Sequence, residues 1–398
     1  MIHRRKNYAI YIMVCVWTLF VACCSGAGDD TPDDITARDG YISFCPSISD
    51  NGEPNGEDAY NENKFTTLDI FLYDEDAGDD EAALLHHHES LTGTGKAPTV
   101  KVPTENLARL FANGGRKLKV VAIANCSEVA ALSGNETSIN RLKAVETRAE
   151  AGAGASFQAA TAPESFVMNT FGRPLTVAVN GEGQGERAYT LAFDRLAAKI
   201  RVALSVKESV TDKDGVEWIP DTDDMRLYIS NGVRTSRLDG DVSRLTHSAN
   251  IAPGDRYYSI STSGSKDTED YGFARRLTRH DENWLSGKKD KAYLYYNDIP
   301  YYTYPNKWSS ETEEPHQTML VVVVPWKCEG NKDGEAYMPT YYVMSVDEEG
   351  TIASDTFYYL RARIEEMGSR EYNAPIWTDA IHMKVSQWIV YENDVVLW

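Results

Sequence analysis

The sequence predicts a mostly β protein that folds as two sandwich-like domains in series with a few short helices. Three observations lead to this fold class. Segments in which apolar and polar residues alternate, the period of a half-buried strand, recur from residue 41 to the C-terminus. Helix signals are few by comparison. The 398 residues are too many for one small core and are typical of two domains.

The first residues have the pattern of an export signal. A cationic stretch at residues 3–6 precedes an apolar run at residues 8–22, which is too short and too close to the N-terminus for a stable membrane span. Ala22 then precedes Cys23, and a small residue before a cysteine is typical of a bacterial lipobox, whose thiol is acylated. We therefore expect a lipoprotein signal peptide and lipobox at residues 1–23, with Cys23 lipidated. An ordinary cleaved secretory signal with incidental cysteines would also export the chain.

Residues 24–38 are predicted to be a flexible acidic tether, because Gly, Asp, Thr and Pro dominate them. The formal net charge of the chain is −20, and no basic patch follows the signal, so the composition disfavours a nucleic-acid-binding protein. Cys45, Cys126 and Cys328 have neither a CxxC partner nor zinc-ligand spacing. One disulfide among the three and three buried single thiols both stay open as interpretations.

In the first predicted domain, residues 39–196, the alternation begins at residues 41–48. Ile42, Phe44 and Ile48 fall on one face of this strand. Residues 118–124 are almost entirely apolar, which predicts a strand that is covered on both faces. The same patterns predict further strands at 66–73, 99–102, 166–168 and 175–179, helices at 104–111 and 138–147, and loops at 50–63, 74–89 and 149–160.

The second predicted domain, residues 197–398, is entered through a long β-like segment at residues 189–206. A strand of this length often runs from one domain into the next, so we place the boundary near Leu196. A loop-rich middle is expected at residues 234–308. Around it, alternating or apolar segments predict strands at 225–229, 320–324, 341–346, 357–364, 381–391 and 395–398.

No pattern in the sequence predicts an enzyme. It contains no GxSxG, HExxH, P-loop or strand–turn–helix GxGxxG motif, so we expect neither catalysis nor a cofactor. Asp74, Asp76, Gly78 and Asp80 are similar to a calcium loop. However, Gly78 stands where the third ligand belongs, and no Glu closes the loop. We therefore expect solvated acids there, and no metal site.

Two clusters of side chains leave alternatives open. His86, His87 and His88 lie in a predicted loop, which either binds a metal weakly or is a solvated loop tip. Residues 293–308 contain six tyrosines and a tryptophan. These rings either bind a glycan or a protein, because Tyr and Trp combine a large contact area with a polar group, or pack a long loop against the sandwich.

The end of the chain is an alternating β segment with a change of phase. The alternation of residues 381–385 continues after residue 387 on the other parity, as a β-bulge would cause. A chain that ends on apolar β residues either buries that strand within its own fold or provides it to a neighbouring subunit. The residues that would form such a donor strand are Ile381, Met383, Val385, Trp388, Val390 and Trp398.

Together, the lipobox, the acidic tether, the two β domains and the terminal strand resemble the fimbrillins, the subunits of the Bacteroidales type V pilus. Residues 39–48 and 65–73 resemble the first two strands of that family. Residues 117–125 (KLKVVAIAN) resemble its "LVVMAN"-like strand, and residues 191–206 (LAFDRLAAKIRVALSV) resemble the strand that enters its second domain. Residues 388–398 (WIVYENDVVLW) resemble its Trp-terminated tail.

The resemblance implies two transthyretin-like β-sandwich domains that polymerise by strand exchange. In that family the lipoprotein reaches the outer membrane, and a trypsin-like protease cuts after a basic residue in the loop behind the first strand. The first strand, here the one with Ile42, Phe44 and Ile48, then leaves, and the C-terminal strand of another subunit replaces it. The implied partners are other fimbrial subunits, the outer membrane through the lipid, and a host protein or glycan in adhesion.

The sequence departs from the family pattern behind the first strand. Residues 50–63 contain no Arg or Lys; the nearest basic residues are Arg38, before the first strand, and Lys64, at the edge of the second. Cutting at Arg38 would not release the strand, and Lys64 lies against structured sequence. Either a protease of another specificity acts, or the subunit keeps its first strand and its lipid, as the anchor subunits of the family do.

A second departure concerns the penultimate strand. The family's basic-Asn-x-x-Tyr signature is missing there, and residues 357–364 stand in its place, which disfavours a major stalk subunit. The alternative from another functional class is a surface glycan-binding lipoprotein that uses the aromatic residues of 293–308.

Overall fold

The computed structural model describes residues 41–48, 61–91, 99–103, 116–148, 165–179, 188–230, 232–233, 235–241, 257–258, 275–280, 291–297, 300–307, 317–328, 337–347, 351–370, 381–382 and 391–397. These residues are mostly β, as the sequence predicts. No helix within these ranges is long and apolar enough to cross a membrane. Cys23, Arg38, the predicted helix at 104–111 and the predicted loop at 149–160 lie outside them.

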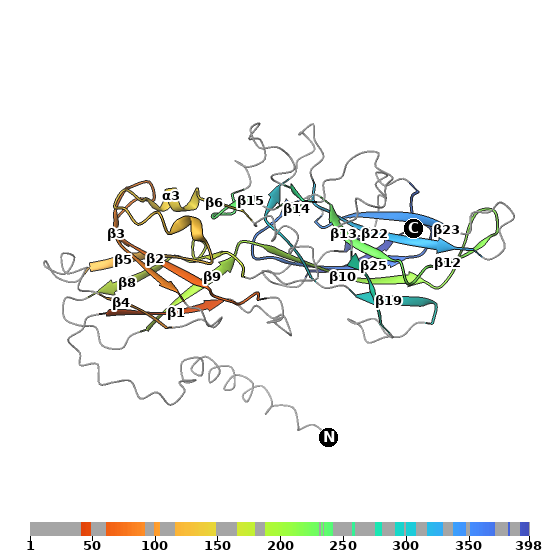
Figure 1. Ribbon diagram of the computed structural model, residues 1–398, viewed down its shortest axis with the longest axis horizontal. Helices are drawn as coiled ribbons and strands as arrows, with labels where there is room; N and C mark the ends of the chain where they lie inside the picture. Colours follow the sequence, from red (N-terminus) through yellow and green to blue (C-terminus); the bar gives the residue numbers. More distant parts are fainter. Residues whose placement is uncertain are drawn as a thin grey trace, which may run out of the picture.

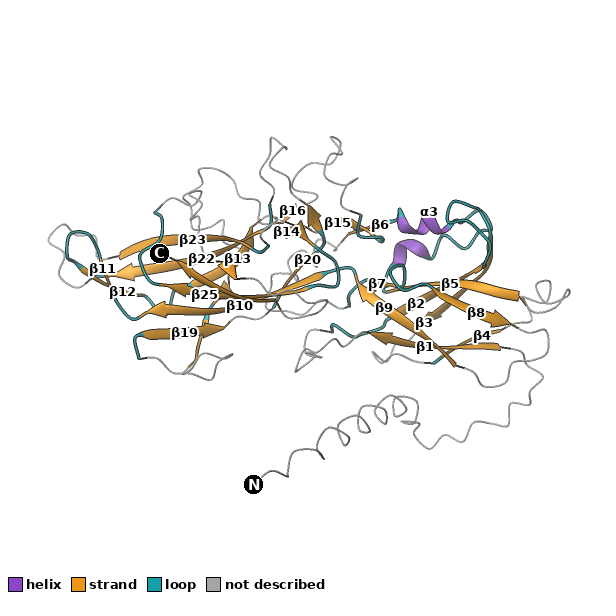
Figure 2. Cartoon of the chain, turned by 180° about the vertical axis from the view of Figure 1, so that it is seen from behind, coloured by secondary structure: helices purple, strands orange, loops and turns teal. Residues whose placement is uncertain are grey.

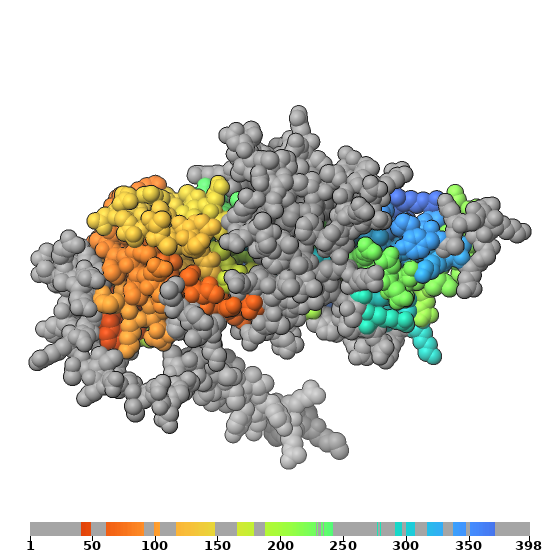
Figure 3. All heavy atoms as spheres, in the orientation of Figure 1, coloured from red at the N-terminus to blue at the C-terminus, as the bar shows by residue number. Residues whose placement is uncertain are grey.

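The strands gather in two groups along the long axis of the molecule (Figures 1 and 2). Strands β1 to β9 lie toward one end, and the strands from β10 onward lie toward the other. In the space-filling view, orange and yellow atoms accordingly gather at one end and green to blue atoms at the other (Figure 3). The short helix α3 (Ile139–Lys143) lies over the first group (Figure 2).

Eight strands of the first group form the first sheet, in the order β3-β2-β5-β7-β9-β1-β4, with β8 paired to β5. Most neighbours are antiparallel, but β1 and β9 are parallel. The strands are β1 (Tyr41–Ile48), β2 (Thr67–Asp74), β3 (Leu84–Leu91), β4 (Val100–Pro103), β5 (Arg116–Ala124), β7 (Met168–Asn169), β8 (Leu175–Val179) and β9 (Ala188–Arg195).

The second group contains two larger sheets. The second sheet has the order β18-β19-β10-β25-β27-β26, with β20 paired to β10, and the third has the order β11-β12-β22-β13-β17, with β23 paired to β22. The second sheet consists of β10 (Ala198–Lys207), β18 (Thr278–His280), β19 (Tyr293–Asn297), β20 (Tyr301–Thr303), β25 (Phe357–Ile364), β26 (Ile381–His382) and β27 (Tyr391–Leu397). The third consists of β11 (Val210–Thr211), β12 (Glu217–Pro220), β13 (Arg226–Ser230), β17 (Arg275–Arg276), β22 (Met319–Lys327) and β23 (Tyr337–Ser345).

Three two-stranded sheets complete the described strands. They pair β14 (Gly232–Val233) with β16 (Tyr257–Tyr258), β6 (Glu146–Arg148) with β15 (Thr235–Arg237), and β21 (Asn306–Lys307) with β24 (Thr351–Ile352). The pair β6–β15 joins the two groups, because β6 belongs to the first part of the chain and β15 to the second.

Apolar side chains at alternate strand positions pack into three larger cores. In β2, Leu68, Ile70 and Leu72 face the first core, together with residues of β1, β4, β5, β8 and β9. Inward residues of the second and third sheets, such as Leu204 and Val322, fill the second core in the manner of a sandwich. Burial of this apolar surface, at about 25 cal/mol per Å², is the main favourable term in folding.

The third core, hereafter the junction core, is shared by the two groups. Phe71 and Val121 reach it from the first sheet, and Val233 and Tyr302 reach it from the second part of the chain. Leu196, at the predicted domain boundary, is also buried there, between the end of β9 and the start of β10. The two groups are therefore held together by packed side chains as well as by the connecting chain.

Two local predictions for the first part of the chain are corrected by the structure. Instead of one helix at residues 138–147, the chain forms α3 and then β6, because residues 146–148 pair with β15. Ser138 caps α3 by accepting a hydrogen bond from the backbone N–H of Arg141 at 3.1 Å. Instead of a loop throughout residues 74–89, the chain turns and forms β3 from residue 84.

The cysteines form no disulfide within the part of the chain that the structure describes. Cys45 is partly exposed, and Cys126 and Cys328 are buried as single thiols. This agrees with the interpretation of these residues as small apolar groups. Burial is the main cause that raises the pKa of the Cys126 thiol well above its ordinary value, so that this thiol stays protonated.

Candidate functional site

The first strand lies between two neighbours of opposite direction. β1 pairs antiparallel with β4, where Ile42 faces Val102 and Phe44 faces Val100. On its other side β1 pairs parallel with β9, where Phe44 aligns with Tyr189. We call the position of β1 between β4 and β9 the slot.

The residues predicted to fill the slot are largely buried. Ile42 and Phe44 lie in the first core, and Ile48 packs against it while partly exposed. Pro46 is also buried, and it lies beyond the end of β4, where β1 has β9 as its neighbour. A proline is tolerated where one edge of the strand needs no N–H donor. Removing β1 would expose apolar surface and unpaired backbone groups on both sides of the slot.

The C-terminal strand has the same combination of neighbours as β1. β27 is parallel to β25 on one side, from Tyr358 opposite Tyr391 to Ile364 opposite Leu397. It is antiparallel to β26 on the other side, where Ile381 faces Val395. Of the predicted donor residues, the structure places Ile381 in β26. The others, Met383, Val385, Trp388, Val390 and Trp398, lie outside the described residues or side chains.

The register of β27 places three of its apolar residues beside buried residues of β25. Residues 391, 393, 395 and 397 align with Tyr358, Leu360, Ala362 and Ile364, which are buried in the second core. Asp394 aligns with Arg361 on the alternate positions. Tyr391, Val395 and Leu397 therefore align with apolar residues, whereas Asn393 aligns with Leu360, and an acid aligns with a base.

Lys64, the first basic residue after β1, lies in a segment that is held by Asn125. The Asn125 side chain donates to the backbone oxygens of Lys64 (2.8 Å) and Phe166 (2.7 Å). It accepts from the N–H of Thr66 at 2.7 Å and from its hydroxyl at 2.9 Å. Asn125 has a φ of 59°, a left-handed conformation that asparagine tolerates better than most residues.

On the other side of this segment, Glu62 enters a buried polar cluster. Its carboxylate lies 2.8 Å from the Nζ of Lys199, whose side chain has no exposed surface, while Glu62 is 2% exposed. The hydroxyl of Tyr302 donates to the same carboxylate. Lys199 lies on β10 and Tyr302 on β20, so this contact joins the segment behind β1 to the second sheet.

Arg195, at the end of β9, extends the buried polar cluster. Its Nε donates to the backbone oxygen of Glu62 at 3.0 Å, and its guanidinium also donates to Asn63. The backbone N–H of Arg195 donates to the carboxylate of Asp355 at 3.1 Å. The same carboxylate lies 3.6 Å from the guanidinium of Arg195. This cluster is not predicted from the sequence, although Lys199, within the otherwise apolar residues 196–200, is a signal that could have indicated it.

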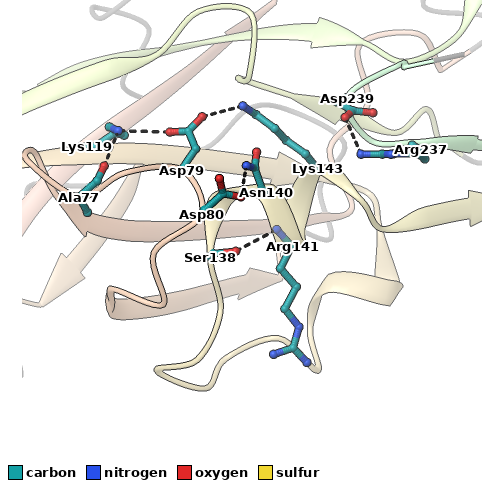
Figure 4. A network of polar contacts seen from close by, with 10 residues as sticks. All are labelled: Ala77, Asp79, Asp80, Lys119, Ser138, Asn140, Arg141, Lys143, Arg237 and Asp239. Atoms are coloured by element: carbon teal, nitrogen blue, oxygen red, sulfur yellow. Dashed lines mark hydrogen bonds and ion pairs between the residues drawn. The ribbon is translucent and has the colours of Figure 1, made fainter. Parts of the chain in front are cut away.

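One aspartate of the largely exposed acidic loop between β2 and β3, Asp79, is bound by lysines, and its side chain is 42% exposed (Figure 4). Asp79 lies 2.8 Å from the Nζ of Lys143 and 3.3 Å from that of Lys119. Asn140 of α3 donates to Asp80 at 2.6 Å. The hydrogen bond from Lys143, ahead of the other causes, holds the pKa of Asp79 below its usual value. No group of residues within the described ranges could hold a metal ion.

The three histidines lie in strand β3, which corrects their predicted place in a loop. The His87 ring stacks on Phe71, with ring centroids 4.6 Å apart, and its Nε2 lies 2.8 Å from Asp69. His86 and His88 lie on the other face of β3, with centroids 6.4 Å apart. The cross-strand pairing with β2 explains why this polar run is a strand.

These histidines make the stability of the protein depend on pH. Burial is the main cause that lowers the pKa of His86 and His88 below the ordinary value of 6.5, and the neighbouring imidazoles lower it further. The unfolded chain therefore takes up protons first when the pH falls below about 6.5. The stabilising contribution of the neutral imidazoles is complete above that pH and is lost as the pH falls toward the lower pKa of the folded state.

We expect the free energy of unfolding of the native chain to fall more steeply between pH 7.5 and pH 5 than that of His86→Gln. Urea unfolding at both pH values measures this difference. Other titrating groups are common to both chains and cancel in the comparison. Parallel pH dependences of the two chains would contradict the prediction.

The aromatic residues at 293–304 form strands and are mostly buried, which corrects the prediction of a loop. Tyr296 and Tyr301 lie in the second core, and Tyr302 and Tyr304 lie in the junction core. The Tyr301 hydroxyl donates to the backbone oxygen of Leu227 at 2.5 Å. These rings are unavailable as a glycan-binding surface. Trp308 lies outside the described residues.

The fold of this chain is similar to that of solved structures, whereas the sequence has no match. No protein-family model and no curated protein matches the sequence. A crystal structure titled as a putative cell adhesion protein from Bacteroides eggerthii DSM 20697 has a TM-score of 0.50 and 15% identity, over 92% of this chain and 100% of that chain. At this identity the likeness shows that the two proteins share a fold.

Two further structures are similar over most of their length. A putative cell adhesion protein from Parabacteroides distasonis ATCC 8503 has a TM-score of 0.45 and 12% identity, over 85% of this chain and 91% of that chain. The tip fimbrial protein Mfa3 from Porphyromonas gingivalis, with a C-terminal truncation, has a TM-score of 0.37 and 12% identity, over 90% of this chain and 100% of that chain.

Proposed function

We propose that this chain is a structural or accessory subunit of a cell-surface fimbria with a role in adhesion, and not an enzyme. It would be exported as a lipoprotein acylated at Cys23, be held at the outer membrane by its lipid, and join other subunits by β-strand exchange. Residues 39–196 and 197–398 would be its two transthyretin-like domains. The fold shared with the Bacteroides eggerthii protein, titled as a putative cell adhesion protein, supports this class of function.

The observation that carries the proposal is the equivalence of two strand positions. β1 lies between a parallel and an antiparallel neighbour, and so does β27. A strand that satisfies the backbone groups of β25 and β26 in one direction can satisfy those of β9 and β4 in the same way. A slot vacated by β1 would therefore accept the C-terminal strand of another copy or of a related subunit.

The slot is also lined by the apolar residues against which a donor strand would pack. Val100, Val102 and Leu191 lie opposite β1 in the first core and would be exposed in its absence. The apolar residues of the tail would each contribute about 1.5–3 kcal/mol if they were fully buried against such residues. The backbone ladder would then fix the direction of the inserted strand.

Two deletions test the exchange. A chain that lacks residues 39–49 has an open slot and a donor tail, and we expect it to form ladders of oligomers that resist mild denaturant. A chain that lacks residues 39–49 and also ends after Pro375 should stay monomeric, and a peptide of residues 381–398 should bind it. The matched control is the same peptide with Val395→Asp and Leu397→Asp, which should not bind.

The result that would overturn the proposal is a folded chain without residues 39–49 that stays monomeric and binds no tail peptide. Circular dichroism and thermal melting establish whether each deletion is folded. A chain that keeps residues 39–49 but ends after Pro375 gives a further test. If its melting transition collapses, β27 is needed in the second sheet of its own subunit, and the donor assignment is wrong.

A further inference from the structure

The segment between β1 and β2 is held by contacts on two sides, and these contacts bear on whether a protease can cut it. Residues 61–67 are bound to the first sheet through Asn125 and to the second sheet through Glu62 and Lys199. We call residues 61–67 with these partners the clamp. It is the part of the chain through which β1 stays covalently joined to everything that follows.

The clamp encloses the peptide bond after Lys64. Phe65 is 1% exposed and packs edge-on against Phe193, with ring centroids 5.4 Å apart. The Lys64 N–H donates to the oxygen of Asn61 at 3.2 Å in a tight turn. A protease binds its substrate as an extended strand with free backbone groups, so cleavage here first requires Glu62 and Phe65 to leave their buried positions.

We infer that the clamp protects the bond after Lys64 from trypsin-like proteases, so that the folded protein keeps β1 in its slot when such a protease is present. Residues 49–60, which lie between β1 and the clamp, contain no Arg or Lys. Lys64 is therefore the first site downstream of β1 at which such an enzyme could release the strand. This inference rests on the proposed function, and under it the chain donates its tail but does not accept one.

Limited trypsin digestion of the full purified chain tests the inference. Mass spectrometry measures the rate of cleavage after Lys64, and a synthetic peptide of residues 58–70, in which Lys64 is the only basic residue, gives the rate for an unprotected site. We expect cleavage in the folded protein to be at least about a hundred-fold slower than in the peptide, because it requires local opening of the clamp.

Variants of the clamp show whether its contacts cause the protection. Asn125→Gly keeps the left-handed backbone but removes the four side-chain bonds to Lys64, Phe166 and Thr66, and should speed cleavage after Lys64 at least about ten-fold. Thr66→Val removes one of these bonds and gives a milder test. Thr340→Val is the matched control, because it removes the two bonds of the Thr340 hydroxyl, one from Trp326 and one to the backbone oxygen of Val324, and should leave this cleavage unchanged.

Cleavage of the native-like protein after Lys64 at a rate within about ten-fold of the peptide rate would overturn the inference. Equal acceleration by Thr340→Val and Asn125→Gly would overturn it as well, since the protection would then reflect global stability. Neither result bears on strand exchange, which is measured by the oligomers and peptide binding of the deletion chains.

Discussion

Replacing Lys199 with methionine is expected to lower the free energy of unfolding by about 3–5 kcal/mol. The change would leave the Glu62 carboxylate buried without its cationic partner, which lies 2.8 Å away in the native protein. Methionine fills most of the volume of the lysine side chain, so the loss would come from the unpaired charge and not from a cavity.

The double variant Lys199→Met/Glu62→Gln should recover most of this loss. Glutamine is neutral and still offers an oxygen to the Tyr302 hydroxyl, which donates to Glu62 in the native protein. Urea unfolding measures both effects as shifts of the midpoint at constant m-value. If the double variant is as unstable as the single one, the cause is packing and not the unpaired charge.

Lys207 provides a control on the same strand. It lies 3.9 Å from Glu365, and its side chain is 44% exposed. Exposed ion pairs contribute about 0–1 kcal/mol, so Lys207→Met should have an effect in this range. A loss of less than about 1 kcal/mol for Lys199→Met would contradict the role assigned to the buried pair.

Replacing Phe44 with alanine is expected to cost about 3–5 kcal/mol, as for other fully buried phenylalanines. Phe44 has no exposed surface, and its ring centroid lies 6.3 Å from that of Tyr189 across the slot. The truncated side chain would leave a cavity that the backbones of β4 and β9 hold open on either side. Thermal melting and urea unfolding measure the loss.

Ser47→Ala is the matched control for Phe44→Ala, because Ser47 lies on the same strand and its side chain is exposed. It should change the stability by less than about 0.5 kcal/mol. An equally small effect for Phe44→Ala would mean that β1 contributes little to the fold, and the slot would then be open or filled by other residues.

The sequence predicts well those strands in which apolar residues recur at the spacing of a strand, even where the partner strand is far away in the chain. β1 lies at the predicted residues 41–48, and β25 at the predicted residues 357–364. The prediction fails for β3, because histidines and acids are weak strand formers. That strand is stabilised by tertiary contacts such as His87 on Phe71.

The candidate site is less predictable than the strands. The apolar faces of β1 follow from alternation, whereas the contact of Glu62 with Lys199 joins residues that are distant in sequence and lie in a predicted loop and a predicted strand. Composition likewise cannot distinguish tyrosines that bind a ligand from tyrosines that fill a core. Tyr301 and Tyr302 prove to be core residues because β20 pairs with β10.

The parallel pairing of β1 with β9 also sets an order of events during folding. Ser43 aligns with Ala188, so β1 needs a partner that is synthesised much later. Closing so long a loop is entropically unfavourable, which delays non-local pairing relative to hairpins such as β2–β3. During folding β1 would thus stay unpaired for longer than β2 and β3, and under the proposed strand exchange the strand of a neighbouring subunit would compete with it in time as well as in affinity.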